Sequence, residues 1–128
     1  MPNTYYFDHV HIVSEDPKNV ADYFRTKFDA KVIETVQDGK PRIDVDLNGL
    51  NIFLYRAARE DNLPACSSSR YKGLDHFGLR VDDLDKACAE LKRRGVQFTM
   101  EPNAVRPGLK IAFVRGPENI RIEILQRG

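Results

Sequence analysis

A short motif occurs twice in this chain, and its repetition constrains the fold more than any other feature. The motif begins with an Asp-His pair, continues with alternating apolar residues and an acidic pair, and leads into a helical pattern, at residues 8–17 and again at residues 75–84. The two histidines, His9 and His76, are 67 residues apart in a chain of 128 residues. Repetition at a fixed interval indicates two copies of one structural unit. It also favours a shared role for the two histidines, since unrelated core histidines would rarely fall at the same point of each copy.

The size and composition of the chain indicate an ordinary globular protein. Its 128 residues suit one domain, and 41% of them are hydrophobic. The 20 basic and 19 acidic residues are balanced, so nothing points to nucleic acid as a partner. No apolar stretch approaches the length of a membrane span, and the N-terminus shows no signal segment. Two cysteines are too few for a disulfide scaffold. We therefore expect one cytoplasmic domain over residues 1–128, without membrane contact, with Cys88 in the core and Cys66 on the surface.

The spacing of apolar residues predicts the same order of elements in both copies. Alternating apolar and polar residues are typical of strands, and Asp16-Pro17 supplies a helix cap followed by a first helical residue. Asn48-Gly49 favours a tight hairpin turn, and Gly95 ends the second helix. The first copy is predicted to have a strand at 5–12, a helix from 17, and then strands at 31–37, 42–48 and 50–56. The second copy is predicted to follow the same order, with a strand at 74–81, a helix at 83–94, and then strands at 96–101, 109–115 and 119–126. A loop is predicted at 102–108.

These elements divide the chain into two modules joined by a linker. Module one covers about 1–57 and module two about 74–128. The polar segment of about 58–73 contains Pro64 and a run of three serines, which is typical of a connection between compact parts.

Strand alternation separates an apolar face of each sheet from a polar one. Residues two apart on a strand share a face. One face is almost purely apolar and should cover the helices, whereas the other carries all three histidines and Glu123, which indicates a wet, lined cavity. By the same alternation, Asp8 and Asp75 should point away from the polar face. The polar face comprises His9, His11, Arg42, Asp44, Asp46, Asn51, Phe53, Tyr55, His76, Arg80, Phe113, Arg121 and Glu123.

The two Asp-His strand starts and the C-terminal run IAFVRGPENIRIEI at 111–124 resemble the vicinal oxygen chelate superfamily. That group includes glyoxalase I, extradiol dioxygenases, methylmalonyl-CoA epimerase, fosfomycin-resistance enzymes and bleomycin-binding proteins. The resemblance covers nearly the whole chain. It implies an α+β fold in which two βαβββ modules form a U-shaped mixed sheet, the glyoxalase/bleomycin resistance/dioxygenase fold. It also implies one divalent metal ion, bound by residues on the first and last strands of each module.

Carried over position by position, the metal ligands of that superfamily fall on His9, His76 and Glu123. The fourth ligand position falls on Phe53, and a phenyl ring cannot bind a metal. The resemblance therefore implies two imidazoles and one carboxylate, with the other positions open to water or substrate. This set suits Fe, Mn, Ni, Co or Zn, and ligand type alone does not choose among them. The alternative is that each of the three residues serves a structural hydrogen-bond network.

Further residues of the polar face are candidates for catalysis and substrate binding. His11 shares a face with His9 and is expected to exchange protons with the substrate, although it could also support the ligands or be a satisfied cavity histidine. Glu123 is expected to serve catalysis as well as the metal. Arg80 and Arg121 could hold an anionic substrate group or pair with acids of the same face. The predicted substrate-binding residues are Phe53, Tyr55, Arg80, Phe113 and Arg121.

The resemblance leaves four classes of function open. The segment from Lys110 to Glu123 looks most like glyoxalase I, so a lyase or isomerase similar to lactoylglutathione lyase comes first. A site of two histidines and one carboxylate also suits an Fe(II) extradiol-type dioxygenase, and after that a fosfomycin-type thiol transferase. A metal-free small-molecule binding protein of the resistance type comes last, because all three ligand positions are present. In each case the partner is a small molecule, and we expect a homodimer because open sheet edges need cover.

Overall fold

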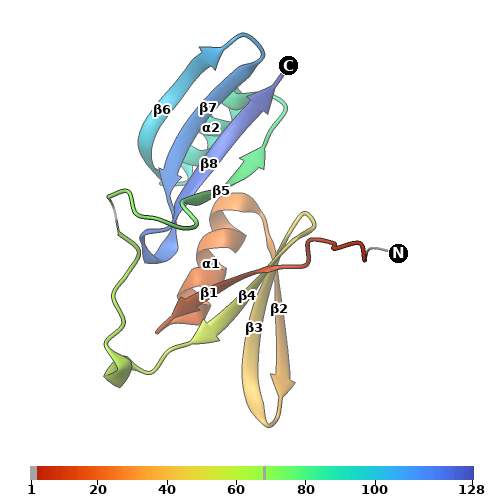
Figure 1. The fold of residues 1–128 in the computed structure, drawn as a ribbon, viewed down its shortest axis with the longest axis vertical. Coiled ribbons are helices and arrows are strands. Elements are labelled where there is room, and N and C mark those ends of the chain that lie inside the picture. The colour runs from red at the N-terminus through yellow and green to blue at the C-terminus, as the bar shows by residue number, and fades with distance from the viewer. Residues whose placement is uncertain (1–2, 68) are drawn as a thin grey trace. The chain divides into compact units, whose positions relative to one another are not determined.

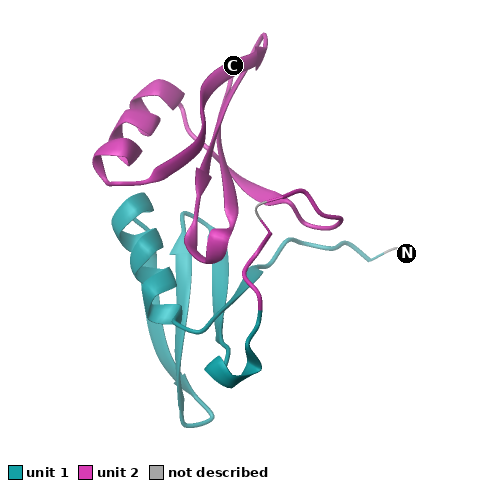
Figure 2. Cartoon of the chain, turned by 90° about the vertical axis from the view of Figure 1, so that its left-hand side faces the viewer, with its two compact units in different colours: residues 1–63 teal, residues 64–128 magenta. Residues whose placement is uncertain are grey.

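The computed structural model describes residues 3–67 and 69–128, and the chain falls into two compact units (Figure 1). The first unit is Met1–Leu63 and the second is Pro64–Gly128 (Figure 2). Each unit contains a four-stranded sheet of mixed direction and one α-helix. The expected α+β fold of two βαβββ modules is therefore confirmed. No helix formed by the described residues is long and apolar enough to cross a membrane.

The first unit runs strand, helix and three strands. Its sheet has the order β1-β4-β3-β2, with β1 parallel to β4 and the other neighbours antiparallel. A short 3-10 helix, Arg59–Asp61, follows the last strand. The elements are β1 (Val10–Ser14), α1 (Pro17–Phe28), β2 (Lys31–Gln37), β3 (Lys40–Leu47) and β4 (Leu50–Arg56).

The second unit repeats this plan. Its sheet has the order β5-β8-β7-β6, again with the first and last strands parallel and the rest antiparallel. A 3-10 turn, Pro117–Asn119, connects β7 to β8. The elements are β5 (His76–Arg80), α2 (Leu84–Arg93), β6 (Gln97–Arg106), β7 (Leu109–Arg115) and β8 (Arg121–Arg127).

The two units pair their strands in the same register. His11 of β1 lies opposite Phe53 of β4, and Gly78 of β5 lies opposite Glu123 of β8. Gly78 follows His11 by the same 67 residues that separate the two motif histidines. Phe53 and Glu123 therefore occupy equivalent positions, in agreement with the sequence alignment that placed a phenyl ring at the fourth ligand position.

Local residue choices explain where the helices begin and end. The carboxylate of Asp16 accepts a hydrogen bond from the amide of Asn19, and that of Asp83 accepts one from the amide of Lys86, each at 3.1 Å. These caps satisfy amides that the first helical turn leaves without partners. After α2 the chain reverses through Gly95, whose φ of 83° suits glycine.

The helix of each unit packs on the apolar face of the same unit's sheet. In the first unit, Val20 and Phe24 of α1 are almost completely buried together with Ile52 of β4. Burial of each large apolar side chain contributes about 1.5–3 kcal/mol. Cys88 is buried and Cys66 exposed, as expected. The core of the second unit is formed mainly by Leu84, Cys88, Leu91, Val114, Ile122 and Ile124.

The first strand of each unit is shorter than the sequence predicts. β1 begins at Val10 and β5 at His76, whereas the patterns predict strands from residues 5 and 74. His9 therefore lies just before its strand. Residues 5–9 precede β1 and expose three aromatic side chains, so alternation there does not reflect strand pairing.

The predicted loop at 102–108 is wrong for most of its length, because β6 continues to Arg106. Proline lacks the amide that a central strand needs, so Pro102 argues against a strand. However, β6 lies at the edge of its sheet, and its pairing with β7 shifts register between Met100 and Asn103. An edge strand with a bulge can hold a proline without losing a required hydrogen bond.

Candidate metal centre

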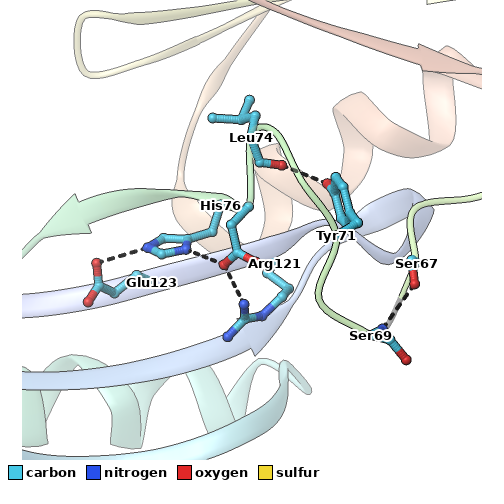
Figure 3. Close-up of polar contacts among 8 residues, drawn as sticks. Ser67, Ser69, Tyr71, Leu74, His76, Arg121 and Glu123 are labelled. Carbon is cyan, nitrogen blue, oxygen red and sulfur yellow. Dashed lines mark hydrogen bonds and ion pairs between the residues drawn. The ribbon is translucent and has the colours of Figure 1, made fainter.

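The second unit brings together two of the three predicted metal ligands. His76 is the first residue of β5, and Glu123 lies on β8, the neighbouring strand. Nε2 of His76 lies 3.4 Å from Oε1 of Glu123 (Figure 3). Both side chains remain partly exposed. An imidazole nitrogen and a carboxylate oxygen therefore face the same accessible point.

Asp75 sets the orientation of the His76 ring. Its Oδ2 lies 2.7 Å from Nδ1 of His76, and the same oxygen accepts a hydrogen bond from Arg121. An ionised carboxylate only accepts hydrogen bonds, so Nδ1 carries the proton and Nε2 keeps the lone pair that a metal ion would need.

The surroundings keep Asp75 ionised. The hydrogen bond from His76 is the largest cause that lowers the pKa of Asp75 below its ordinary value. Partial burial opposes this effect, and the positive charges of Arg121, His76 and Arg70 lower the pKa further. Asp75 therefore carries its charge at neutral pH, which is the state that orients the imidazole.

Gly78 makes room for the carboxylate of Glu123. The two residues lie opposite each other in the β5–β8 pairing. A Cβ atom at position 78 would lie 3.3 Å from Oε1 of Glu123 and 3.1 Å from Cδ2 of Leu125. The carboxylate of Glu123 thus lies where the side chain of any residue other than glycine at position 78 would crowd it.

The first unit repeats the Asp-His pair but not the carboxylate. Oδ2 of Asp8 lies 2.7 Å from Nδ1 of His9. The ring of Phe53 stacks on that of His9, with centroids 4.2 Å apart, and the guanidinium of Arg42 lies 4.7 Å from the Phe53 centroid. Phe53 therefore packs against the imidazole at the position where the second unit has an acid.

An acid is nevertheless present in the first unit, one strand away. Asp44 of β3 lies opposite Phe53, and Phe113 of β7 lies opposite Glu123. Each unit thus has a carboxylate paired with a phenyl ring across its third and fourth strands. In the first unit the carboxylate is on the third strand, and in the second unit it is on the fourth. Nε of Arg42 donates to Oδ2 of Asp44 at 2.8 Å, whereas Oδ1 is buried and has no hydrogen-bond partner within the described part of the chain.

A pocket of about 520 Å³ opens in the second unit beside His76. Phe113 and Arg121, two of the predicted substrate-binding residues, line it. The ring of Phe113 meets His76 edge-on, with centroids 4.9 Å apart, and the guanidinium of Arg121 lies 4.6 Å from the Phe113 centroid. The volume falls within the usual range for small-molecule sites.

The other predicted site residues are placed differently. The ring of His11 is exposed, 6.3 Å from that of His9 and 6.1 Å from that of Tyr55. These three side chains belong to the first unit. Arg80 ends β5, is exposed, and does not line the pocket.

The His76–Glu123 pair fits a metal ion. Two donors bound to one ion at about 2.1 Å, at right or tetrahedral angles, lie roughly 3.0–3.4 Å apart. The separation of 3.4 Å between Nε2 and Oε1 meets that condition. His9 belongs to the first unit, and its approach to the other two ligands stays a prediction. Across residues 3–67 and 69–128 the structure places no group of three or more His, Cys, Asp or Glu side chains that could hold a metal.

Sequence reasoning missed Asp75 as a site residue. Strand alternation placed it on the face away from His76, but it precedes β5, where that rule does not apply. Its side chain instead lines the pocket with His76. The usable signal was the Asp-His pair, because a carboxylate next to a ligand histidine commonly orients the ring. Gly78 gave no comparable signal, since its role depends on the strand opposite.

The match to a family model identifies the group to which these features belong. The model of the Glyoxalase/Bleomycin resistance protein/Dioxygenase superfamily matches residues 6–124. The chain belongs to this superfamily.

One relative is a probable chloroplastic lactoylglutathione lyase of Arabidopsis thaliana, 39% identical to this chain over 57 residues. The match covers 44% of this chain and 16% of that protein. The chain therefore spans much less than two thirds of the relative's length.

Solved structures show the same fold. A glyoxalase/bleomycin resistance protein/dioxygenase from Alicyclobacillus acidocaldarius is similar with a TM-score of 0.69 and 22% identity, covering 99% of this chain and 95% of that one. The fosfomycin resistance protein FosX from Listeria monocytogenes has a TM-score of 0.72 and 15% identity, covering 98% and 96%. Likeness at this level of identity concerns the fold alone.

Proposed function

We propose that this chain is a divalent-metal-dependent lyase or isomerase that acts like lactoylglutathione lyase, with His9, His76 and Glu123 as the metal ligands. The observation that carries the proposal is the His76–Glu123 pair, whose donor atoms are 3.4 Å apart. Asp75 supports it by holding Nδ1 of His76, which leaves Nε2 for an ion. The partial match to a lactoylglutathione lyase supports the reaction class.

In this proposal the reaction moves a proton next to a carbonyl group. A divalent ion such as Fe, Mn, Ni, Co or Zn, held by His9, His76 and Glu123, would polarise the carbonyl oxygen and stabilise the negative charge that develops there. Glu123 or His11 takes the proton from carbon and returns it to the neighbouring atom. Phe113 offers an apolar surface for the substrate in the pocket beside His76.

A second candidate is an Fe(II) extradiol-type dioxygenase, and the observation that favours it is Phe53. A ring at the position equivalent to Glu123 leaves two histidines and one carboxylate, the ligand set of many non-haem Fe(II) oxygenases. The open positions of such an ion would accept both a catechol and oxygen.

Metal analysis tests the site that both candidates share. The chain is purified without a histidine tag, and bound metal is measured by elemental analysis for the unchanged protein, His76→Ala and His11→Ala. We expect His76→Ala to lose most of its metal and His11→Ala to keep it, because His11 is not a proposed ligand. Equal metal content in His76→Ala and the unchanged protein would refute the site.

Activity assays then separate the chemistries. A lyase or isomerase should exchange a substrate C–H proton with solvent deuterium on a panel of α-keto thiohemiacetals, without oxygen uptake. Oxygen consumption with catechols on Fe(II)-loaded protein would instead support the dioxygenase. Silence in both assays, with a filled metal site, would leave a fosfomycin-type thiol transferase or a substrate outside both panels, and a chain that binds no metal would favour a metal-free binding protein.

We also propose a homodimer. Each four-stranded sheet ends in two edge strands, which are β1 and β2 in the first unit and β5 and β6 in the second. Such edges need cover from another chain, from side chains or from loops. Light scattering that gives a monomer mass at micromolar concentration would contradict the dimer without affecting the metal site. The cytoplasmic location expected from the sequence stays a prediction.

A further inference from the structure

The pocket of the second unit has an excess of positive charge. Arg70 precedes β5, Arg115 ends β7 and Arg121 begins β8, and all three line the pocket. Asp75 is the one acid among the described residues that line it, and it is already bound to His76 and Arg121. Three guanidinium groups around one engaged carboxylate leave the pocket suited to an anion.

Two of these arginines face each other across neighbouring strands. Arg115 lies opposite Arg121 in the β7–β8 pairing. Like charges directly opposite one another destabilise a sheet. Arg121 turns to Asp75 and lies over the ring of Phe113, whereas Arg115 remains exposed. Arg115 and Arg121 therefore both present a guanidinium group to the pocket that they line.

The rest of the pocket combines apolar side chains with the polar Thr99, Asn119 and His76. Phe113, Met100 and Ile120 line it together with the arginines. A small inorganic anion would leave this apolar surface in contact with water. A ligand with an apolar body would cover it, and a ligand of that kind would extend from the arginines toward His76, which lines the same pocket.

We propose that this pocket binds a small organic acid, with its carboxylate held by Arg70 and Arg115 and its apolar body against Phe113. The planar guanidinium group matches a carboxylate with two parallel hydrogen bonds, which a lysine could not provide. The proposal deepens the proposed function, because it names a carboxylate-bearing substrate for the site at His76 and rests on that function only in this respect. Binding of the acid itself needs no metal.

The test measures binding of phenylacetate to the full chain by calorimetry or NMR, before and after treatment with a chelator. Phenylacetamide, which has the same shape without the charge, and inorganic phosphate serve as comparison ligands. The variants are Arg70→Met and Arg115→Met, and Arg127→Met is the matched control, since Arg127 is an exposed arginine of β8 that does not line the pocket.

We expect phenylacetate to bind with and without the chelator, and more tightly than the amide or phosphate. Arg70→Met and Arg115→Met should each weaken binding by about 10- to 100-fold, as loss of a hydrogen bond to a charged group does. Arg127→Met should bind like the unchanged protein. Arg70 lies outside the sheet, so its variant keeps the test valid if Arg115→Met fails to fold.

Equal binding of the acid and its amide would overturn the proposal, and so would tighter binding of phosphate or equal effects of all three variants. Loss of phenylacetate binding in a chain that still holds its metal would refute this pocket and leave the proposed function intact. Phenylacetate binding by a chain that binds no metal would support this pocket and refute the metal-dependent function.

Discussion

Replacement of Asp75 by asparagine should weaken metal binding more than the matching change at Asp8. Both carboxylates lie 2.7 Å from Nδ1 of the next histidine, so the two changes remove the same charge from the same kind of contact. Asparagine still offers an oxygen to Nδ1, so the ring can keep its orientation while its basicity falls. Loss of such a partner typically costs 10–100-fold in metal affinity.

The structure indicates where in that range each variant should lie. The side chain of Asp75 is 34% exposed and is held in place by Arg121 as well, whereas that of Asp8 is 80% exposed. Water screens the exposed contact more strongly. We therefore expect a loss near 100-fold for Asp75→Asn and near tenfold or less for Asp8→Asn, on the scale of known partner changes.

The assay is a titration with a competing metal chelator, with denaturant unfolding of the metal-free proteins to confirm that both variants fold. Affinity of Asp75→Asn equal to that of the unchanged protein would refute the orienting role of Asp75. A larger loss for Asp8→Asn would refute the argument from exposure.

Three further changes test other parts of the structure. Phe53→Glu should tighten metal binding at least about tenfold, which is roughly 1.4 kcal/mol, because it restores a carboxylate at the position equivalent to Glu123. Phe53→Leu is the control, since leucine cannot bind a metal, and equal affinities of the two variants would show that position 53 does not face the metal. Gly78→Ala should lower metal affinity, because its Cβ would crowd Oε1 of Glu123, while the free energy of unfolding changes by no more than about 1 kcal/mol. Unchanged metal affinity in a chelator titration would contradict this prediction. Burial raises the pKa of the Cys88 thiol to about 11, so a thiol reagent at pH 8 should react with the exposed Cys66 alone in the folded chain and with both cysteines after unfolding. Rapid reaction of both cysteines in the folded chain would show that Cys88 is accessible.

Much of the fold could be predicted because its signals are local. The cap residues before each helix, the Asn48-Gly49 turn and the alternation of apolar residues all act within a few positions of the chain. The repeat of the Asp-His pair then showed that the second half follows the same order as the first. Strand ends were predicted less well, because pairing with a neighbour decides where a strand begins. β1 therefore starts after His9, and β6 passes through Pro102.

The sequence by itself determined which residue types were available to the site, and on which strands. It placed a histidine at the start of each copy and a carboxylate near the end of the second. It also showed a phenyl ring at the equivalent position of the first copy. Spacing along the chain sufficed for this, because a strand repeats every two residues and the two copies share one alignment.

The tertiary structure decided which of these groups meet. Arg121 and Asp75 are 46 residues apart in the chain, yet Arg121 donates a hydrogen bond to Oδ2 of Asp75, the same oxygen that contacts Nδ1 of His76. Glu123 reaches toward that ring because Gly78, on the neighbouring strand, has no side chain. Such contacts depend on register and on side-chain rotamers between strands that the sequence separates widely. The alternation of residues along one strand cannot predict which side chains of different strands will be in contact.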